Sequence, residues 1–216
     1  MKKLLPLLIL LLVLFLAACA SSTEPPPTAA PAEVEPTQVP AEPTPTPTPA
    51  PIEGDPADIL GEPTGVDTFD SAANWTLFDN QCFKSEITDG KYVMTAKGLE
   101  GVVCWEVSWP QIKDFYNEIT IDMPEQCQPD DRFGLLFRAP DNNRGYLYGL
   151  TCDGRYTMTM WDGETTSVIV EPASSDVIKT GPDAVNRIGV VAYAGSYILY
   201  ANGVQLAEAQ DFTFTQ

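Results

Sequence analysis

Residues 66–216 are predicted to form an all-β sandwich, and three features of this part of the chain predict it. Short runs of aromatic and β-branched residues recur at intervals of about 8–12 residues, with turn-forming residues between them. Several runs alternate apolar and polar residues, which is typical of a strand with one buried face. No helical period persists for three turns. About a dozen such strands indicate a sandwich or a jelly roll.

The first 18 residues have the pattern of a secretory signal peptide. Lys2 and Lys3 precede an apolar core from Leu4 to Leu16, which is shorter than the ~20 residues of a transmembrane helix. The sequence LAAC at 16–19 resembles the lipobox of bacterial lipoproteins. This resemblance implies that Cys19 becomes the mature N-terminus and carries the lipid, palmitate included. We therefore expect a lipid-anchored protein of the cell envelope that faces outside the cytoplasm. A secreted protein with a chance cysteine is the alternative.

Residues 19–65 are predicted to be the lipidated cysteine followed by a disordered linker. This stretch is rich in Pro, Thr, Ala and Glu, and it contains no aromatic or basic residue. Such a composition buries no core, and its Thr-Pro repeats favour extended polyproline II. We interpret it as a spacer between membrane and domain; the alternative is a ligand for a proline-binding partner domain.

Turn dipeptides divide the domain into hairpins. Asp-Gly at 89–90 and 153–154 and Asn-Gly at 202–203 each separate two apolar runs, as two-residue hairpin loops do. Within 115–123, Ile119 and Ile121 alternate with Glu118 and Asp122. The expected strands are 83–87, 92–96, 102–109, 115–123, 133–137, 146–152, 156–161, 167–170, 187–193, 197–201 and 204–207.

Charge and composition exclude several classes of function. The net charge is −18, so the protein repels phosphate backbones and nucleic acid is not an expected partner. The chain contains no histidine. This excludes Ser-His-Asp and Cys-His catalysis and histidine-based zinc sites. An enzyme would have to use carboxylates, Lys or Tyr.

Four cysteines remain besides Cys19, and an even number outside the cytoplasm indicates two disulfides. Of the three pairings, strand register favours Cys82–Cys104 and Cys127–Cys152. The first two lie at the same end of the expected three-strand meander. The loop that holds Cys127 should lie beside the end of the 146–152 strand. A four-thiolate zinc site is the alternative, but the spacings contain no Cys-x-x-Cys pair.

Several segments resemble the concanavalin A-like, laminin G-like jelly rolls of bacterial surface proteins, over roughly Val66–Phe214. They are Phe69-Asp70, Asn74-Trp75, DGKY at 89–92, FGLLFR at 133–138, DGRY at 153–156, Asn186-Arg187 and YANG at 200–203. The resemblance implies two antiparallel sheets, one of them concave, and a binding or sensory module; a related branch includes hydrolases of sugars. The family's glycine-led last strand has no match, and 211–216 still alternates. We expect the last strand to be absent or supplied from elsewhere.

Aromatic and arginine residues gather around the two central hairpins at 132–161 and predict a glycan site. Aromatic faces stack on sugar rings, and planar guanidinium groups hydrogen-bond to hydroxyls. The alternative is that several of these rings belong to the core. From this group, Arg138, Tyr148 and Trp161 are the predicted ligand-binding residues.

Acidic loop residues provide a candidate calcium site. Asp130, Asp131 and Asp141 lie in oxygen-rich turns, and laminin G-like domains often hold calcium at a rim. They lack the fixed spacing of a calcium loop, and turn chemistry explains Asp141 equally well. No other cofactor is expected.

A catalytic carboxylate pair is not found. Glu118 and Asp122 lie four apart on one strand and so about 13 Å apart. A retaining glycosidase needs about 5.5 Å and an inverting one about 6.5–9.5 Å. The expected function is therefore a non-catalytic binding module for an extracellular glycan. The alternatives are a carbohydrate-active hydrolase of the same fold and a protein-interaction or sensory domain.

Overall fold

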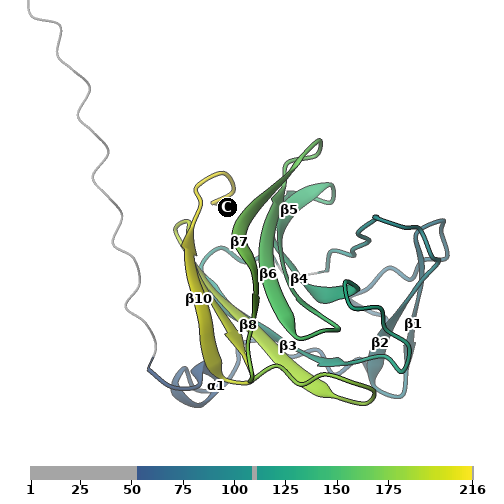
Figure 1. The fold of residues 1–216 in the computed structure, drawn as a ribbon, viewed down its shortest axis with the longest axis horizontal. Coiled ribbons are helices and arrows are strands. Elements are labelled where there is room, and N and C mark those ends of the chain that lie inside the picture. The colour runs from purple at the N-terminus through teal and green to yellow at the C-terminus, as the bar shows by residue number, and fades with distance from the viewer. Residues whose placement is uncertain (1–52, 109–110, 216) are drawn as a thin grey trace, which may run out of the picture. The chain divides into compact units, whose positions relative to one another are not determined.

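The computed structural model describes residues 53–108 and 111–215. Within these residues, nearly all regular structure belongs to two four-stranded antiparallel sheets and one two-stranded hairpin (Figure 1). The predicted all-β sandwich is thus confirmed, and its concanavalin A-like character stays a prediction. The signal peptide and Cys19 lie outside the described residues. In the part that is described, no helix has the length and apolar character needed to cross a membrane.

Most consecutive strands form hairpins within one sheet, but the chain passes twice between the two four-stranded sheets. The first sheet contains, in spatial order, β10 (Val204–Gln210), β9 (Ser196–Ala201), β8 (Val185–Tyr193) and β3 (Phe115–Asp122). The second sheet contains β4 (Arg132–Asp141), β5 (Arg144–Thr151), β6 (Arg155–Trp161) and β7 (Thr166–Ser174). The separate elements are the hairpin of β1 (Phe83–Thr88) and β2 (Lys91–Ala96), and the single-turn helix α1 (Pro56–Ile59).

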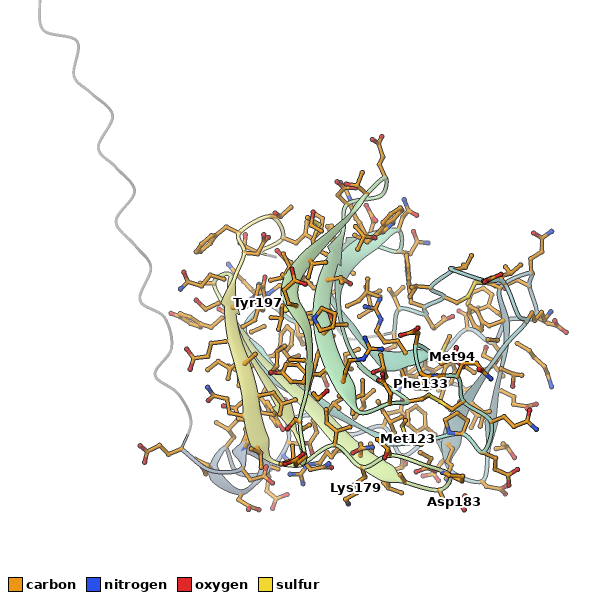
Figure 2. All side chains as sticks on the ribbon, viewed as in Figure 1. Met94, Met123, Phe133, Lys179, Asp183 and Tyr197 are labelled. Carbon is orange, nitrogen blue, oxygen red and sulfur yellow. A yellow bond between two sulfur atoms is a disulfide. The ribbon has the colours of Figure 1, made fainter. Side chains whose placement is uncertain are left out.

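The core lies between the two four-stranded sheets and is rich in tyrosine. Tyr146, Tyr148 and Tyr197 are at most 1% exposed, and Figure 2 shows Tyr197 among the side chains between the layers. Two hydroxyls cross the core. Tyr148 on β5 donates to the carbonyl of Tyr200 on β9 at 2.8 Å. Tyr156 on β6 donates to the carbonyl of Leu206 on β10 at 3.0 Å. These bonds satisfy polar groups that burial would otherwise leave unpaired.

The hairpin predictions are largely confirmed. Asp89 and Gly90 have φ of 52° and 69°, and Asn202 and Gly203 have φ of 50° and 81°, as a primed two-residue turn requires.

The expected strand at 102–109 is wrong for the residues described. Residues 102–108 contain no strand, and Val102 is 52% exposed. Among the described strands β2 pairs with β1 alone, so a free strand edge exists and strand-like composition by itself does not make this segment pair.

Both predicted disulfides are present. Cys82 bonds to Cys104 and Cys127 bonds to Cys152, with Cα–Cα distances of 6.1 Å and 6.0 Å. The first pairing holds although the third strand of the expected meander is absent, because the 97–108 segment still returns toward β1. There the backbone N–H of Lys97 donates to the carbonyl of Cys82 at 3.0 Å.

The folded domain begins earlier than residue 66. Pro56 is fully buried, and Asp55 forms an ion pair with Arg187 on β8. The Arg187 guanidinium also lies 3.1 Å from the carboxylate of Glu118, which accepts a 2.5 Å hydrogen bond from the Tyr116 hydroxyl. The predicted linker boundary is therefore wrong, because a partly buried ion-pair network holds the end of the proline-rich segment against the first sheet.

Residues 211–215 cover one end of the core without forming a strand. Phe214 packs against the core cluster, and its carbonyl accepts a 3.2 Å hydrogen bond from the Tyr197 hydroxyl. The Tyr146 hydroxyl donates to Asp211 and accepts from the backbone N–H of Phe214. The expectation that a last strand is supplied from elsewhere stays a prediction.

Replacing Gly134 by Ala is expected to destabilise the β4–β5 pair. A Cβ at this position would lie 1.9 Å from the carbonyl oxygen of Tyr148, so backbone atoms must shift. The expected loss in the free energy of unfolding is about 1–3 kcal/mol, measured by denaturant titration. Gly65→Ala is the matched control, because its Cβ would meet nothing within 4 Å. Equal stability of the two variants would contradict the close β4–β5 contact at Gly134.

Candidate functional site

The candidate site is the face of the β4–β7 sheet that points away from the core. Leu135, Tyr148 and Met158 point into the core, so their neighbours along each strand point outward. The cross-strand pairs Gly134–Gly149, Gly149–Thr157, Leu147–Thr159 and Gly145–Trp161 confirm which residues share the face. We call this set the outer face: Arg132, Gly134, Leu136, Gly145, Leu147, Gly149, Thr157, Thr159, Trp161 and Val168. In Figure 1 the sheet curves between β10 and the β1–β2 hairpin.

The centre of the outer face is low and polar. Gly134 and Gly149 lie opposite each other on β4 and β5, and Gly149 pairs with Thr157 on β6. The Thr157 hydroxyl donates to the carbonyl of Val170 at 2.9 Å. The strands carry no large side chain here, yet this centre is buried, with Thr157 and Thr159 each 6% exposed. Leu136 and Leu147 add a half-buried apolar border.

Arg132 lies across this centre. A Cβ built on Gly149 would come within 2.8 Å of Arg132 Cγ, so the missing side chain at Gly149 makes room for the arginine stem. Arg132 Nη1 is 3.5 Å from Thr159 Oγ1, two strands away from β4. The side chain is half-buried, and this burial lowers the pKa of its guanidinium from the ordinary value. The group still carries its charge at neutral pH.

Arg132 differs from the other arginines in its electrostatic partners. Arg138, Arg144, Arg155 and Arg187 each form an ion pair with at least one carboxylate. No carboxylate in the described part of the chain does so for Arg132. A cation that is partly desolvated, and that pairs with no carboxylate among the described residues, therefore lies on the outer face, whose central residues Thr157 and Thr159 are each 6% exposed.

Two indoles lie toward the opposite end of the sheet. Trp161 is partly exposed at the end of β6, and its cross-strand partner Gly145 has no side chain to cover it. The indole N–H of Trp105 donates to the carbonyl of Asn142, in the turn between β4 and β5, at 3.0 Å. This bond ties the 97–108 segment to the end of the sheet where Trp161 lies.

The acidic residues at the Arg132 end have a different partner. Arg155 forms ion pairs with Asp130 at 2.5 Å and with Asp153 at 2.8 Å. Asp153 also accepts a 2.6 Å hydrogen bond from the Thr151 hydroxyl. Hydrogen bonds from Thr151 and Arg155 lower the pKa of Asp153, so this carboxylate is an anion that helps to position Arg155.

The structure corrects two of the three predicted ligand-binding residues. Tyr148 is 1% exposed and belongs to the core. Arg138 has a positive φ of 50° at a register shift after Phe137, and its side chain is 0% exposed. Its guanidinium contacts Asp114 and the carbonyl of Thr215, so it supports the C-terminal segment rather than a ligand. Trp161, the third predicted residue, is partly exposed and lies on the outer face.

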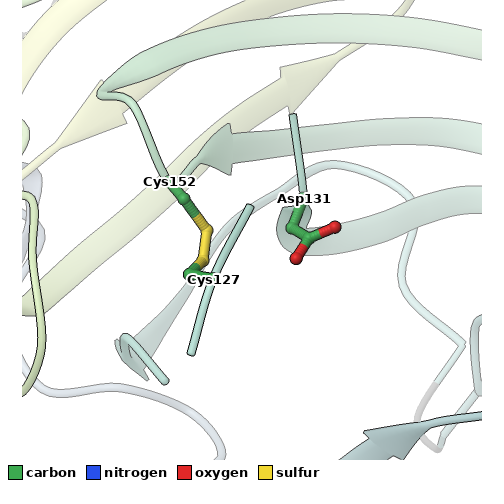
Figure 3. A group of neighbouring side chains, drawn as sticks. All are labelled: Cys127, Asp131 and Cys152. Carbon is green, nitrogen blue, oxygen red and sulfur yellow. A yellow bond between two sulfur atoms is a disulfide. The ribbon is translucent and has the colours of Figure 1, made fainter. Parts of the chain in front are cut away.

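The three predicted calcium ligands do not come together. Asp130 and Asp131 precede β4 and Asp141 ends it, and a ten-residue strand spans roughly 30 Å. Asp141 pairs with Arg144 at 2.8 Å. Asp131 lies beside the Cys127–Cys152 disulfide, whose sulfurs are bonded to each other and offer no thiolate to a metal (Figure 3). Calcium binding at either end of the strand stays a prediction.

Sequence reasoning missed Arg132, Thr157 and Thr159 as site residues. The alternation along β6 does indicate that its threonines face outward together with Trp161. Thr157, Thr159 and Trp161 alternate there with Tyr156, Met158 and Met160. The sequence does not reveal that Gly149 lies beneath Arg132. That relation depends on the register between β4 and β5.

A second group of aromatic residues supports the β1–β2 hairpin. Phe69, Trp75 and Tyr92 pack with ring centroids 4.5–6.2 Å apart. Glu106 lies nearby and receives a hydrogen bond from the backbone of Thr76, yet burial raises the pKa of its carboxyl. Its Oε2 has no hydrogen-bond partner among the described residues. We interpret this group as a small satellite core that contains one poorly solvated acid.

Comparison with known proteins adds little to this geometry. No family model and no curated protein matches the sequence. Among solved structures, the carbohydrate binding module CBM66 from Bacillus subtilis is similar, with 18% identity and a TM-score of 0.45. The match covers 51% of this chain and 66% of that chain. Because the similarity is this low, the candidate site depends on the strand register and contacts of this chain alone.

Glu106→Gln is expected to raise the melting temperature at pH 7. The folded-state pKa of Glu106 lies above its unfolded value, so its stabilising contribution is present below the unfolded pKa and is lost as pH rises through the folded pKa. The gain should therefore disappear near pH 3.5, below the ordinary glutamate pKa of about 4.3. Thermal melts across this range test it, with exposed Glu100→Gln as control. A gain that does not change with pH would contradict the burial of a charged Glu106 carboxylate as its cause.

Proposed function

We propose that this protein is a membrane-anchored, extracytoplasmic lipoprotein whose β-sandwich is a non-catalytic binding module for glycans. The outer face is the proposed ligand site. The observation that carries the proposal is Arg132, whose half-buried side chain is held over Gly149 on the outer face and pairs with no carboxylate in the described part of the chain.

The chemistry of the outer face suits a sugar. Pyranose rings have apolar faces that stack on an indole, and Trp161 offers a partly exposed one. Their hydroxyls take hydrogen bonds from a guanidinium, which Arg132 supplies. Asp130 and Asp153, two of the three acids at the Arg132 end, are engaged by Arg155, which supports binding over hydrolysis, and Asp131 accepts a hydrogen bond from the backbone N–H of Gln128.

The anchor is proposed from the sequence motif at 16–19. A lipid on Cys19 and the proline-rich linker would hold the domain away from the membrane. The ion pair between Asp55 and Arg187 would then end the spacer at a defined place on the first sheet.

Cys19→Ser is expected to release the protein from membranes. Without the thiol no lipid can be attached, so the variant should leave the membrane pellet for the soluble fraction, or accumulate with its signal peptide uncleaved. Fractionation and intact mass measure this, with Ser21→Ala as the control. Wild-type protein without a lipid mass increment would contradict the proposed anchor.

Arg132→Ala and Trp161→Ala are each expected to weaken glycan binding by about tenfold or more, because each removes a hydrogen-bonding or stacking contact. A glycan array with the purified mature lipoprotein first identifies a ligand, and calorimetry then compares the variants. Lys84→Ala is the control, since it removes one positive charge from strand β1, which is not part of the outer face. Absence of binding across the array would contradict the proposal. Release of reducing ends from a bound polysaccharide would show a hydrolase.

A further inference from the structure

We infer that the glycan bound by the outer face carries a carboxylate and that this carboxylate pairs with Arg132. The inference rests on the proposed glycan-binding function and specifies the ligand class. It predicts preference for a sugar acid over the neutral sugar of the same stereochemistry and linkage.

The first support is the distribution of charges. The chain has 30 acidic and 12 basic residues, so an arginine without an acidic partner is unexpected. Four of the five arginines in the described residues have such a partner, namely Arg138, Arg144, Arg155 and Arg187. Asp130 and Asp153 lie at the same end of the sheet as Arg132 and both pair with Arg155. Among these arginines, Arg132 is thus the one suited to an anion from outside the chain.

The second support is the energetics of the buried cation. Arg132 is half-buried, and Gly149 allows its stem to lie flat on the sheet. Partial removal of water from a charged group costs free energy unless a partner compensates. A ligand carboxylate would provide this compensation through charge-assisted hydrogen bonds, which are about twice as strong as neutral ones.

The third support is the number of donors that Arg132 presents. A guanidinium has five N–H donors. The one hydrogen bond of Arg132 within the described residues is the 3.5 Å contact to Thr159, at the outer limit of such bonds. A planar guanidinium whose donors are largely unused matches a planar carboxylate in the paired, two-bond geometry.

The overall charge restricts which acidic glycans fit. A net charge of −18 repels polyanions at long range. The expected ligand therefore carries isolated acidic residues, such as a single uronic acid within or at the end of a neutral chain. Trp161 would stack on a neighbouring sugar ring, because it lies toward the opposite end of the sheet from Arg132.

The test compares glycans that contain one uronic acid with their carboxyl-reduced counterparts, in which the carboxylate has become a hydroxymethyl group. Calorimetry with the mature lipoprotein should show the acidic member bound about tenfold or more tightly, as expected for one charge-assisted pair. Arg132→Gln should abolish this preference and leave the weak binding of the reduced member. Arg132→Lys should keep part of the preference, since the charge remains but the planar fork is lost. Lys84→Gln should keep all of it.

The outcomes separate the inference from the proposed function. Equal or tighter binding of the carboxyl-reduced members would overturn the inference and leave glycan binding intact. Binding of sulfated members alone would also overturn it, because the anion would not be a carboxylate. Absence of binding to every glycan would overturn the proposed function and the inference with it. If an Arg132 variant does not fold, the acid-versus-reduced comparison on the wild-type protein still decides.

Discussion

The packing of two tyrosine-rich sheets against each other determines the rest of this domain. The Tyr148 and Tyr156 hydroxyls each bond to a backbone carbonyl of the opposite sheet, which fixes how the two layers align. A strand that slipped by one residue would move its buried set to the surface. Core packing therefore also decides which residues of β4, β5 and β6 face outward. The candidate site is the face of the β4–β7 sheet that this packing leaves pointing away from the core.

On the outer face, a glycine determines where the Arg132 side chain can lie. Gly149 leaves space that the Arg132 stem occupies, so its guanidinium reaches toward Thr159 on β6. The remaining arginines illustrate the alternative arrangement. Arg187 ties the N-terminal segment to the first sheet, and Arg138 ties the C-terminal segment to the core, each with a carboxylate as partner. These two arginines hold the terminal segments in place, whereas Arg132 pairs with no carboxylate in the described residues and is the arginine that we propose contacts the ligand.

Much of the fold could be predicted from the sequence, because it depends on local signals. Asp89-Gly90 and Asn202-Gly203 specify tight turns by backbone conformation alone, and the register that follows from the first of them brought the correct cysteines together. The errors involve interactions between distant residues. Residues 102–108 have a strand-like composition but pair with no strand in the described structure. Arg138 was predicted to bind the ligand, but it has a positive φ and its side chain contacts Asp114. The role of Arg132 depends on Gly149, seventeen residues away, which no local pattern reveals.

The most direct test of the outer face as the ligand site is a map of the ligand-contacting residues. Backbone amide NMR spectra of the mature protein would be recorded during titration with a glycan found by the array. The largest chemical-shift changes are predicted at outer-face amides, those of Gly134, Gly149, Thr157 and Thr159, with little change in the first sheet. Changes concentrated on β8 to β10, or around Phe69 and Trp75 beside the β1–β2 hairpin, would contradict it.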